Sequence, residues 1–168
     1  QRVYPTARIV HRLDMATSGL LVMALDKDTH RRLSKQFELR QTHKTYIARV
    51  FGQVNGERGS VDLPLICDWP NRPKQMVCQQ RGKPSLTHWR VLERNDDMTR
   101  MELTPVTGRS HQLRVHMLSL GHPILGDRLY AHSDALRMAN RLQLHAQTLG
   151  FTHPVTNASV DFHAPVPF

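Results

Sequence analysis

One acidic side chain stands where it could do chemistry. Asp14 ends the sequence His11-Arg12-Leu13-Asp14, after an apolar stretch and before the turn-forming residues Thr17-Ser18-Gly19. Aspartate is disfavoured in strands and common at turns, so Asp14 by itself can be a simple turn residue. In a pocket that excludes water, the same carboxylate could act as a nucleophile or as a base. The choice between these interpretations depends on its partners elsewhere in the chain.

The segments around Asp14 predict the elements that would position it. Residues 8–13 and 20–25 are rich in β-branched and large apolar side chains, which favours two strands. The second is a nearly continuous apolar run, which predicts a strand buried on both faces. A helix capped by Asp28 or Thr29 is expected next, ending near Arg40.

The remaining elements complete one α+β domain over residues 1–168, with a mixed or antiparallel sheet and flanking helices. A second helix is expected to begin with Ser110 as its N-cap and to end at Gly121. The loop over residues 121–130 is interpreted as structural. The expected strands cover residues 44–51, 61–67, 86–93, 100–106, 142–151 and 158–162, and a short helix is expected over 133–140.

The net charge of the chain is +9, which predicts a polyanionic partner. Between Lys27 and Arg49 there are seven lysines and arginines against two acidic residues, a local excess of +5. Such clustering is typical of nucleic-acid binding. A solvated helix face would explain the same charges, so this alternative stays open.

Several classes of protein find no support in the sequence. The longest apolar run, Leu20–Leu25, has six residues, whereas a membrane-spanning helix needs about 20. Cys67 and Cys78 lack the spacing of a zinc site, and we interpret both as free thiols in a reducing cytoplasm. Gly-rich phosphate loops and metal-binding histidine pairs are absent from the sequence, so neither a metal nor a cofactor is expected.

Three stretches together are more specific than Asp14 alone. They are His11–Asp14 with Thr17–Leu21, Lys44–Val50, and Thr107–His116 with Gly121–Asp127. In order and spacing they resemble the motifs of the RluA-type pseudouridine synthases. The segment Asp62–Gln75 resembles the branch whose members act on both ribosomal and transfer RNA. The resemblance implies the pseudouridine synthase catalytic fold and the cofactor-free isomerisation of uridines in 23S ribosomal RNA and in the anticodon stem-loop of tRNA.

The resemblance also implies roles for three residues. Asp14 would be the catalytic carboxylate, Tyr46 would pack on the target uracil, and Arg114 would pair with Asp14 and hold it ionised. The reaction must break the N1–C1′ bond, turn the base and join C5 to C1′. A flat ring at Tyr46 would hold the base while letting it turn, and its hydroxyl could also handle the C5 proton. Attack on C1′, addition to the uracil ring and elimination through a glycal all use the same carboxylate and remain open.

The target uridine must leave its stack to reach such a site, which calls for further RNA contacts. Arg12 could fill the vacated space or hold a phosphate, although a plain surface arginine is an equal alternative. Trp69 between cations suits base stacking, whereas a tryptophan folded onto the domain is the competing interpretation. The other expected RNA contacts are Lys44, Arg72, Lys74, Arg109 and His111.

One departure from the family pattern produces an alternative function. The family has a strand with the sequence Lys-Pro-x-Gly ahead of these motifs, and nothing before Gln1 matches it. An RNA-binding module without activity is therefore the main alternative, and a metal-dependent nuclease or deaminase built on histidine and aspartate is a weaker one. No obligate protein partner is inferred, and a monomer is expected.

Overall fold

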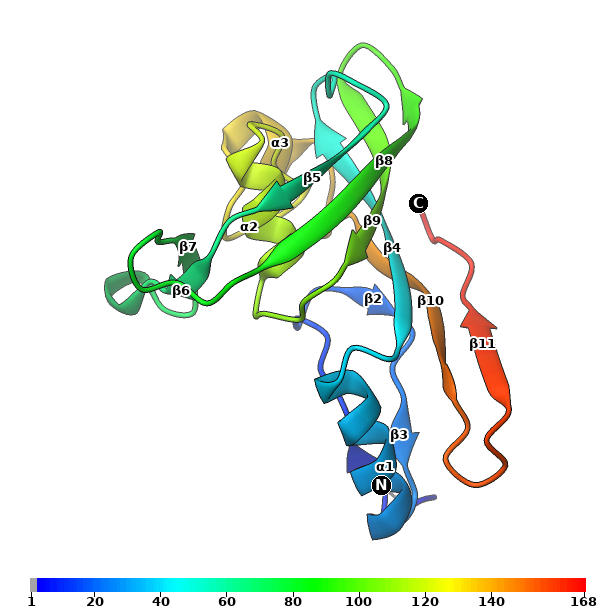
Figure 1. Cartoon of the computed structure of the whole chain (residues 1–168). Coiled ribbons are helices and arrows are strands. Elements are labelled where there is room, and N and C mark those ends of the chain that lie inside the picture. The colour runs from blue at the N-terminus through cyan, green and yellow to red at the C-terminus, as the bar shows by residue number, and fades with distance from the viewer. Residues whose placement is uncertain (1–2) are drawn as a thin grey trace.

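One large sheet organises the chain, with strands in the order β11-β10-β4-β9-β8-β5 (Figure 1). The structure is a computed structural model that describes residues 3–168. Neighbouring strands on this path are antiparallel, whereas β2 pairs with β10 in parallel, so the sheet is mixed, as the sequence predicts. Its strands are β2 (Ser18–Gly19), β4 (His43–Phe51), β5 (Arg58–Asp62), β8 (Leu86–Arg94), β9 (Met98–Pro105), β10 (Leu144–Thr152) and β11 (Ser159–His163).

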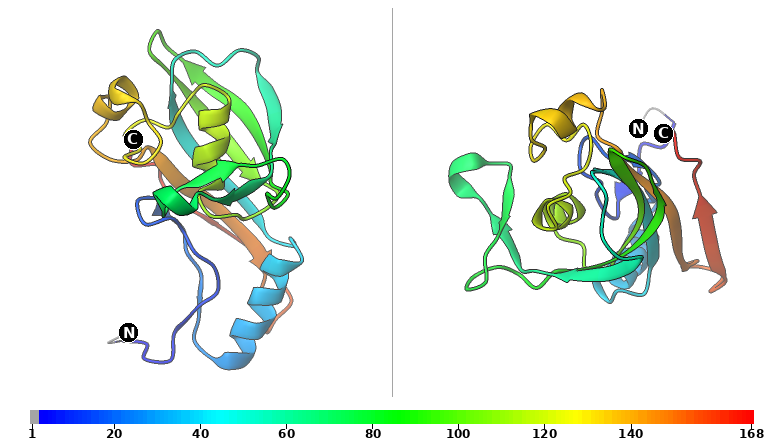
Figure 2. Two further views of the ribbon diagram at one scale, coloured as in Figure 1. Left: turned by 90° about the vertical axis from the view of Figure 1, so that its left-hand side faces the viewer. Right: turned by 90° about the horizontal axis from the view of Figure 1, so that it is seen from above.

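Helices and two small ribbons surround this sheet. Helix α2 (Gln112–Ser119) lies against one face of the sheet, and α1 (Lys27–Glu38) lies at one end of it, as Figure 1 and Figure 2 show. Helix α3 (Ser133–Arg137) follows the loop after α2. The ribbons are β1 (Arg8–Ile9) with β3 (Met23–Ala24), and β6 (Leu65–Cys67) with β7 (Gln75–Val77), which flank the short 3-10 turn η1 (Trp69–Asn71).

The main core lies between the sheet and α2. Strand β4 forms at its predicted position, with Ala48 and Val50 buried in this core and Tyr46 packed against it. From α2, Leu113 and Met117 fill the space in front of the sheet. A second apolar cluster joins Leu33 of α1 to the β10 end of the sheet, which fixes the segment that carries Asp14 between two cores.

Several local predictions were wrong. Leu21, Met23 and Leu25 are 44%, 42% and 50% exposed, because only one face of residues 20–25, with Leu20, Val22 and Ala24, packs against the second apolar cluster. The cap of α1 is Asp26, whose Oδ1 accepts a hydrogen bond from the Thr29 N–H. Helix α2 is preceded by His111 in a left-handed conformation, and no side-chain cap from Ser110 forms.

The strand predicted over residues 61–67 is divided, because residues 61–62 end β5 in the main sheet and residues 65–67 form β6 in a separate ribbon. The strand predicted over 8–13 is reduced to Arg8–Ile9. The remaining predicted strands and helices are confirmed with small shifts in their ends. Strands β8 and β9 form an antiparallel pair at their predicted positions, β10 and β11 form another, and Gly121 has a positive φ just after α2. Cys67 and Cys78 are free thiols, as predicted. Among the helices of residues 3–168, none has the length and apolar character needed to cross a bilayer.

Candidate active site

The loop that carries Asp14 is fastened to strand β10. The Asp14 carbonyl accepts a hydrogen bond from the Thr17 N–H at 2.9 Å, which closes a turn. The two residues of β2 then pair with β10, and the Ser18 hydroxyl lies 2.9 Å from Nδ1 of His145. At Gly19 the backbone has a φ of +109°, and a Cβ there would lie 2.2 Å from the Ala146 carbonyl oxygen. Only glycine therefore allows this close approach.

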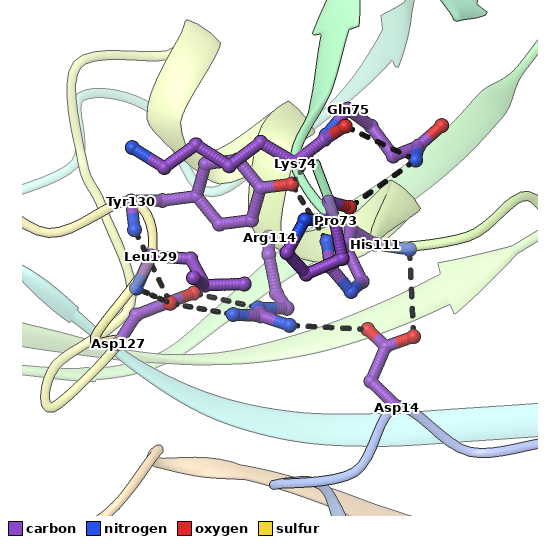
Figure 3. Close-up of polar contacts among 9 residues, drawn as sticks. All are labelled: Asp14, Pro73, Lys74, Gln75, His111, Arg114, Asp127, Leu129 and Tyr130. Carbon is purple, nitrogen blue, oxygen red and sulfur yellow. Dashed lines mark hydrogen bonds and ion pairs between the residues drawn. The ribbon is translucent and has the colours of Figure 1, made fainter. Parts of the chain in front are cut away.

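Two donors face the Asp14 carboxylate (Figure 3). Nη1 of Arg114 lies 3.7 Å from one oxygen, and the backbone N–H of His111 donates to the other with an N···O distance of 3.4 Å. Asp14 retains 23% side-chain exposure, whereas Arg114 retains 4%. The carboxylate is thus open to a ligand on one side and faces positive charge on the other, where the first turn of α2 adds a favourable dipole.

A second carboxylate, Asp127, holds Arg114 in place. Its two oxygens accept hydrogen bonds from Nε and Nη2 of Arg114, both at 2.7 Å. The Asp127 side chain is fully buried, and it also accepts from the backbone N–H groups of Leu129 and Tyr130. Burial lowers the pKa of Arg114, but the hydrogen bonds and charges of Asp127 outweigh this effect, with a further contribution from Asp14, and raise it. A charged guanidinium in fixed orientation is left with Nη1 free to face Asp14.

Sequence reasoning missed Asp127 and Tyr130, because it interpreted the loop over 121–130 as structural only. A usable signal exists in that loop. Asp127 follows the apolar run Pro123-Ile124-Leu125, and an aspartate is almost never fully buried unless it is paired. Had Asp127 been expected to be buried, a cationic partner such as Arg114 would also have been expected.

A pocket of about 810 Å³ opens beside Asp14, within the range of about 300–1,000 Å³ that is usual for small-molecule sites. Its walls are the loop over 10–14, the end of α1, the start of β4 and the segment over 104–110. Tyr46 lines it, and burial, together with the charge of Asp14, raises the pKa of Tyr46 to about 12. Tyr46 is therefore a neutral phenol at neutral pH and presents an uncharged ring to the pocket.

The rim of the pocket carries several of the predicted RNA contacts. Arg12, Lys44 and Arg109 line it, with Arg12 and Arg109 exposed and Lys44 half-buried. Burial lowers the pKa of Lys44. Next to it, His11 stacks on the ring of Phe37 at 4.5 Å, and burial, with the charge of Lys44, lowers the pKa of His11 to about 4.

A buried amide positions the segment that leads into α2. Oε1 of Gln112 accepts from the Thr107 hydroxyl at 2.7 Å and from the Arg109 N–H at 3.0 Å. Its Nε2 donates to the Leu86 carbonyl and to the Thr87 hydroxyl, each at 3.0 Å. Gln112 is 4% exposed, so these bonds fix the turn before α2 from the protein interior. Sequence reasoning did not single out Gln112.

The structure does not bring Trp69, Arg72 and Lys74 into the pocket. They lie on the hairpin β6–β7, where Trp69 is 64% exposed and the Arg72 guanidinium stacks on its ring at 4.8 Å. The indole is therefore not folded onto the domain. Lys74 is half-buried near Tyr130 (Figure 3). His111 contributes its backbone N–H to Asp14, while its imidazole is 2.7 Å from the Tyr130 hydroxyl.

Comparisons with known proteins agree with this fold and site. A sequence profile described as RNA pseudouridylate synthase matches residues 1–119. The whole chain is 57% identical to "Dual-specificity RNA pseudouridine synthase RluA" of Yersinia pestis and 59% identical to that of Escherichia coli, and covers 82% and 77% of those proteins. The solved structure of human RNA Pseudouridylate Synthase Domain Containing 1 matches 99% of this chain and 71% of its own, with a TM-score of 0.87 and 33% identity.

The chain therefore belongs to the RNA pseudouridylate synthase family. Its full-length similarity to the RluA proteins places it in the RluA type of that family, as the sequence motifs indicate. It is an RNA pseudouridine synthase, an isomerase with RNA as its substrate. The alternative of an RNA-binding module without activity is not supported, because these relatives are enzymes.

Proposed function

We propose that Asp14 supplies the catalytic carboxylate of this synthase, that Tyr46 stacks on the target uracil and that Arg114 holds Asp14 ionised. The observation that carries this proposal is the placement of Asp14 at the edge of the pocket, with Arg114 and the His111 N–H on one side and Tyr46 nearby. Opposite charge and a backbone donor stabilise the anionic form of a carboxylate in a partly buried site.

Each side chain suits one part of the isomerisation. The N1–C1′ bond breaks, the uracil turns, C5 bonds to C1′, and the proton on C5 moves to N1 through a base or solvent. Asp14 would attack C1′, attack the ring, or remove a sugar proton, and each route needs an ionised oxygen. The neutral ring of Tyr46 can hold the detached base by stacking without fixing its rotation.

The RNA contacts follow from the position of the pocket. Arg12, Lys44 and Arg109 surround the pocket and would contact the phosphates next to the flipped uridine or fill the space that it leaves. Trp69 and Arg72 together offer a stacking surface and a positive charge outside the pocket, where RNA beyond the target nucleotide would lie. Lys74, on the same hairpin, would support that contact.

The substrates that we propose are 23S ribosomal RNA and the anticodon stem-loop of tRNA. The similar proteins of Yersinia pestis and Escherichia coli are named as dual-specificity enzymes, and the net charge of +9 suits an RNA partner. We further propose that residues 1–168 act as a monomeric catalytic domain in the cytoplasm, where bacterial ribosomal and transfer RNA are found.

Replacing the carboxylate by an amide tests the proposal. With stem-loop RNA tritiated at C5 of uridine, we expect Asp14→Asn to lower the release of label by about 1,000-fold or more, while RNA binding is largely kept. Asp134→Asn, which changes an exposed aspartate on α3, is the matched control and should release label like the wild type. Turnover of Asp14→Asn at the wild-type rate would refute the assignment, and comparing transcripts of 23S rRNA and tRNA tests the specificity.

A further inference from the structure

The hydroxyl of Tyr130 contacts both the hairpin β6–β7 and His111, the residue whose N–H faces Asp14 (Figure 3). It accepts a hydrogen bond from the Gln75 N–H at 2.8 Å, at the start of β7 in the hairpin. It also lies 2.7 Å from Nδ1 of His111, whose backbone N–H faces Asp14. The hairpin β6–β7 and the Asp14 carboxylate are thus connected through Tyr130 and His111.

His111 needs such support, because its backbone is in an unfavourable conformation. Its φ is +54° and its ψ is 16°, in the left-handed region that L-residues other than glycine adopt only at an energetic cost. This conformation turns its N–H towards Asp14. The backbone of His111 is held by the helix α2 that follows it. Its imidazole is held by Tyr130, whose ring lies edge-on to it, with 5.6 Å between the ring centroids.

The protonation states of the two side chains are compatible with this bond. Burial raises the pKa of Tyr130 to about 12 and lowers the pKa of His111. At neutral pH the phenol of Tyr130 keeps its proton and can donate it to the free Nδ1 of His111. The Tyr130 oxygen still has a lone pair for the Gln75 N–H, so both bonds can form at once.

We propose that Tyr130 is a positioning residue for catalysis: its hydroxyl orients His111, so that the His111 N–H is aimed at Asp14, and ties this geometry to the hairpin β6–β7. This inference rests on the proposed catalytic role of Asp14. The hairpin carries Trp69 and Arg72, so RNA seated on it would stabilise the arrangement of Asp14 through the Gln75 N–H. The ring of Tyr130 has a separate task, because the Arg114 guanidinium stacks on it at 5.0 Å.

Removing one oxygen separates the two tasks of Tyr130. Tyr130→Phe keeps the ring beneath Arg114 and deletes both hydrogen bonds of the hydroxyl. In single-turnover release of C5 tritium, we expect the rate constant at saturating enzyme to fall by about 10- to 100-fold. The Kd for the stem-loop RNA and the Tm of the protein should stay near their wild-type values. Tyr4→Phe, at an exposed tyrosine, is the matched control.

A double-mutant cycle with His111→Ala tests the route of the effect. If Tyr130 acts through His111, the double variant should be no slower than the slower single variant, whereas independent effects would multiply. An unchanged rate in Tyr130→Phe, or fully multiplicative effects in the cycle, would overturn the inference. Asp14→Asn is measured in parallel: its inactivity beside an unaffected Tyr130→Phe rejects only the role of Tyr130, whereas full activity of Asp14→Asn rejects the proposed function itself.

Discussion

The three charged side chains Asp14, Arg114 and Asp127 have different electrostatic roles in the site. Arg114 makes its two short hydrogen bonds with Asp127 and only a longer contact, 3.7 Å, with Asp14. Asp127 thus holds and neutralises the arginine in the protein interior, while Asp14 remains accessible at the pocket edge. A carboxylate clamped by Arg114 as tightly as Asp127 would have less freedom to approach a nucleotide.

The pairing of Asp127 with Arg114 predicts a large effect on stability. Asp127→Ala leaves the guanidinium buried without its main partner, which should lower the free energy of unfolding by about 3–5 kcal/mol. Urea unfolding measures this change. Asp134→Ala removes a similar aspartate–arginine contact on the surface of α3, where both side chains are more than 60% exposed, and should cost less than about 1 kcal/mol. Equal effects of the two substitutions would show that the buried pair has no special role.

At the scale of elements, the longer strands could be predicted from the sequence and the catalytic loop could not. Strand β4 places Tyr46, Ala48 and Val50 on the face that packs on α2, and this pattern of every second residue is visible in the sequence. Segments β1, β2 and β3 have two residues each, β1 and β3 pair only with each other, and the pairing of β2 depends on β10 far away in the chain. Local composition therefore overestimated the strands on both sides of Asp14.

The candidate site also has one part that could be predicted from the sequence and one part that could not. Asp14, Tyr46 and Arg114 were found because motif order carries information that no single residue has. Asp127 and Tyr130 lie in a loop without periodicity, and their contacts with Arg114 and His111 arise only when that loop folds back over α2. The conformation of His111 was also beyond sequence reasoning, because Ser110 is the better cap by residue type and tertiary contacts decide against it.

The contact between β2 and β10 predicts that Gly19 is required. Gly19→Ala would place a Cβ against the Ala146 carbonyl at a positive φ, so the strand pair must separate and the Asp14 loop must shift. We expect a loss of more than about 2 kcal/mol in the free energy of unfolding and a lower kcat, measured by urea unfolding and tritium release. In the unfolding measurement, Gly108→Ala is the control, since no atom lies within 4 Å of its Cβ position. A Gly19→Ala protein as stable as this control would contradict the argument.

For the whole molecule, positive charge is the feature that relates most directly to its substrate. The excess of basic residues is spread over α1, the pocket rim and the hairpin β6–β7, so the contact with RNA should extend beyond the target uridine. Binding would combine stacking at Trp69, which salt affects little, with phosphate contacts, which salt weakens.

This division predicts two kinds of response to salt. In fluorescence anisotropy with stem-loop RNA between about 50 and 200 mM salt, Arg109→Ala should flatten the plot of log Kd against log salt concentration by about 0.7, the value for one phosphate on a single strand. Trp69→Ala should weaken binding without changing the slope. Arg137→Ala, on α3 and paired with Asp134, should leave both unchanged. A change of slope in Trp69→Ala would argue against base stacking by the indole.

The pairing of β2 with β10 also has a consequence for protein synthesis. The Asp14 loop leaves the ribosome well before the strand that holds it, because His145 and Ala146 of β10 are made more than a hundred residues later. Arg114, Asp127 and Tyr130 are also made before that strand. A nascent chain therefore cannot present an assembled site to the ribosomal RNA that surrounds it until β10 has emerged, and activity begins only once the sheet is nearly complete.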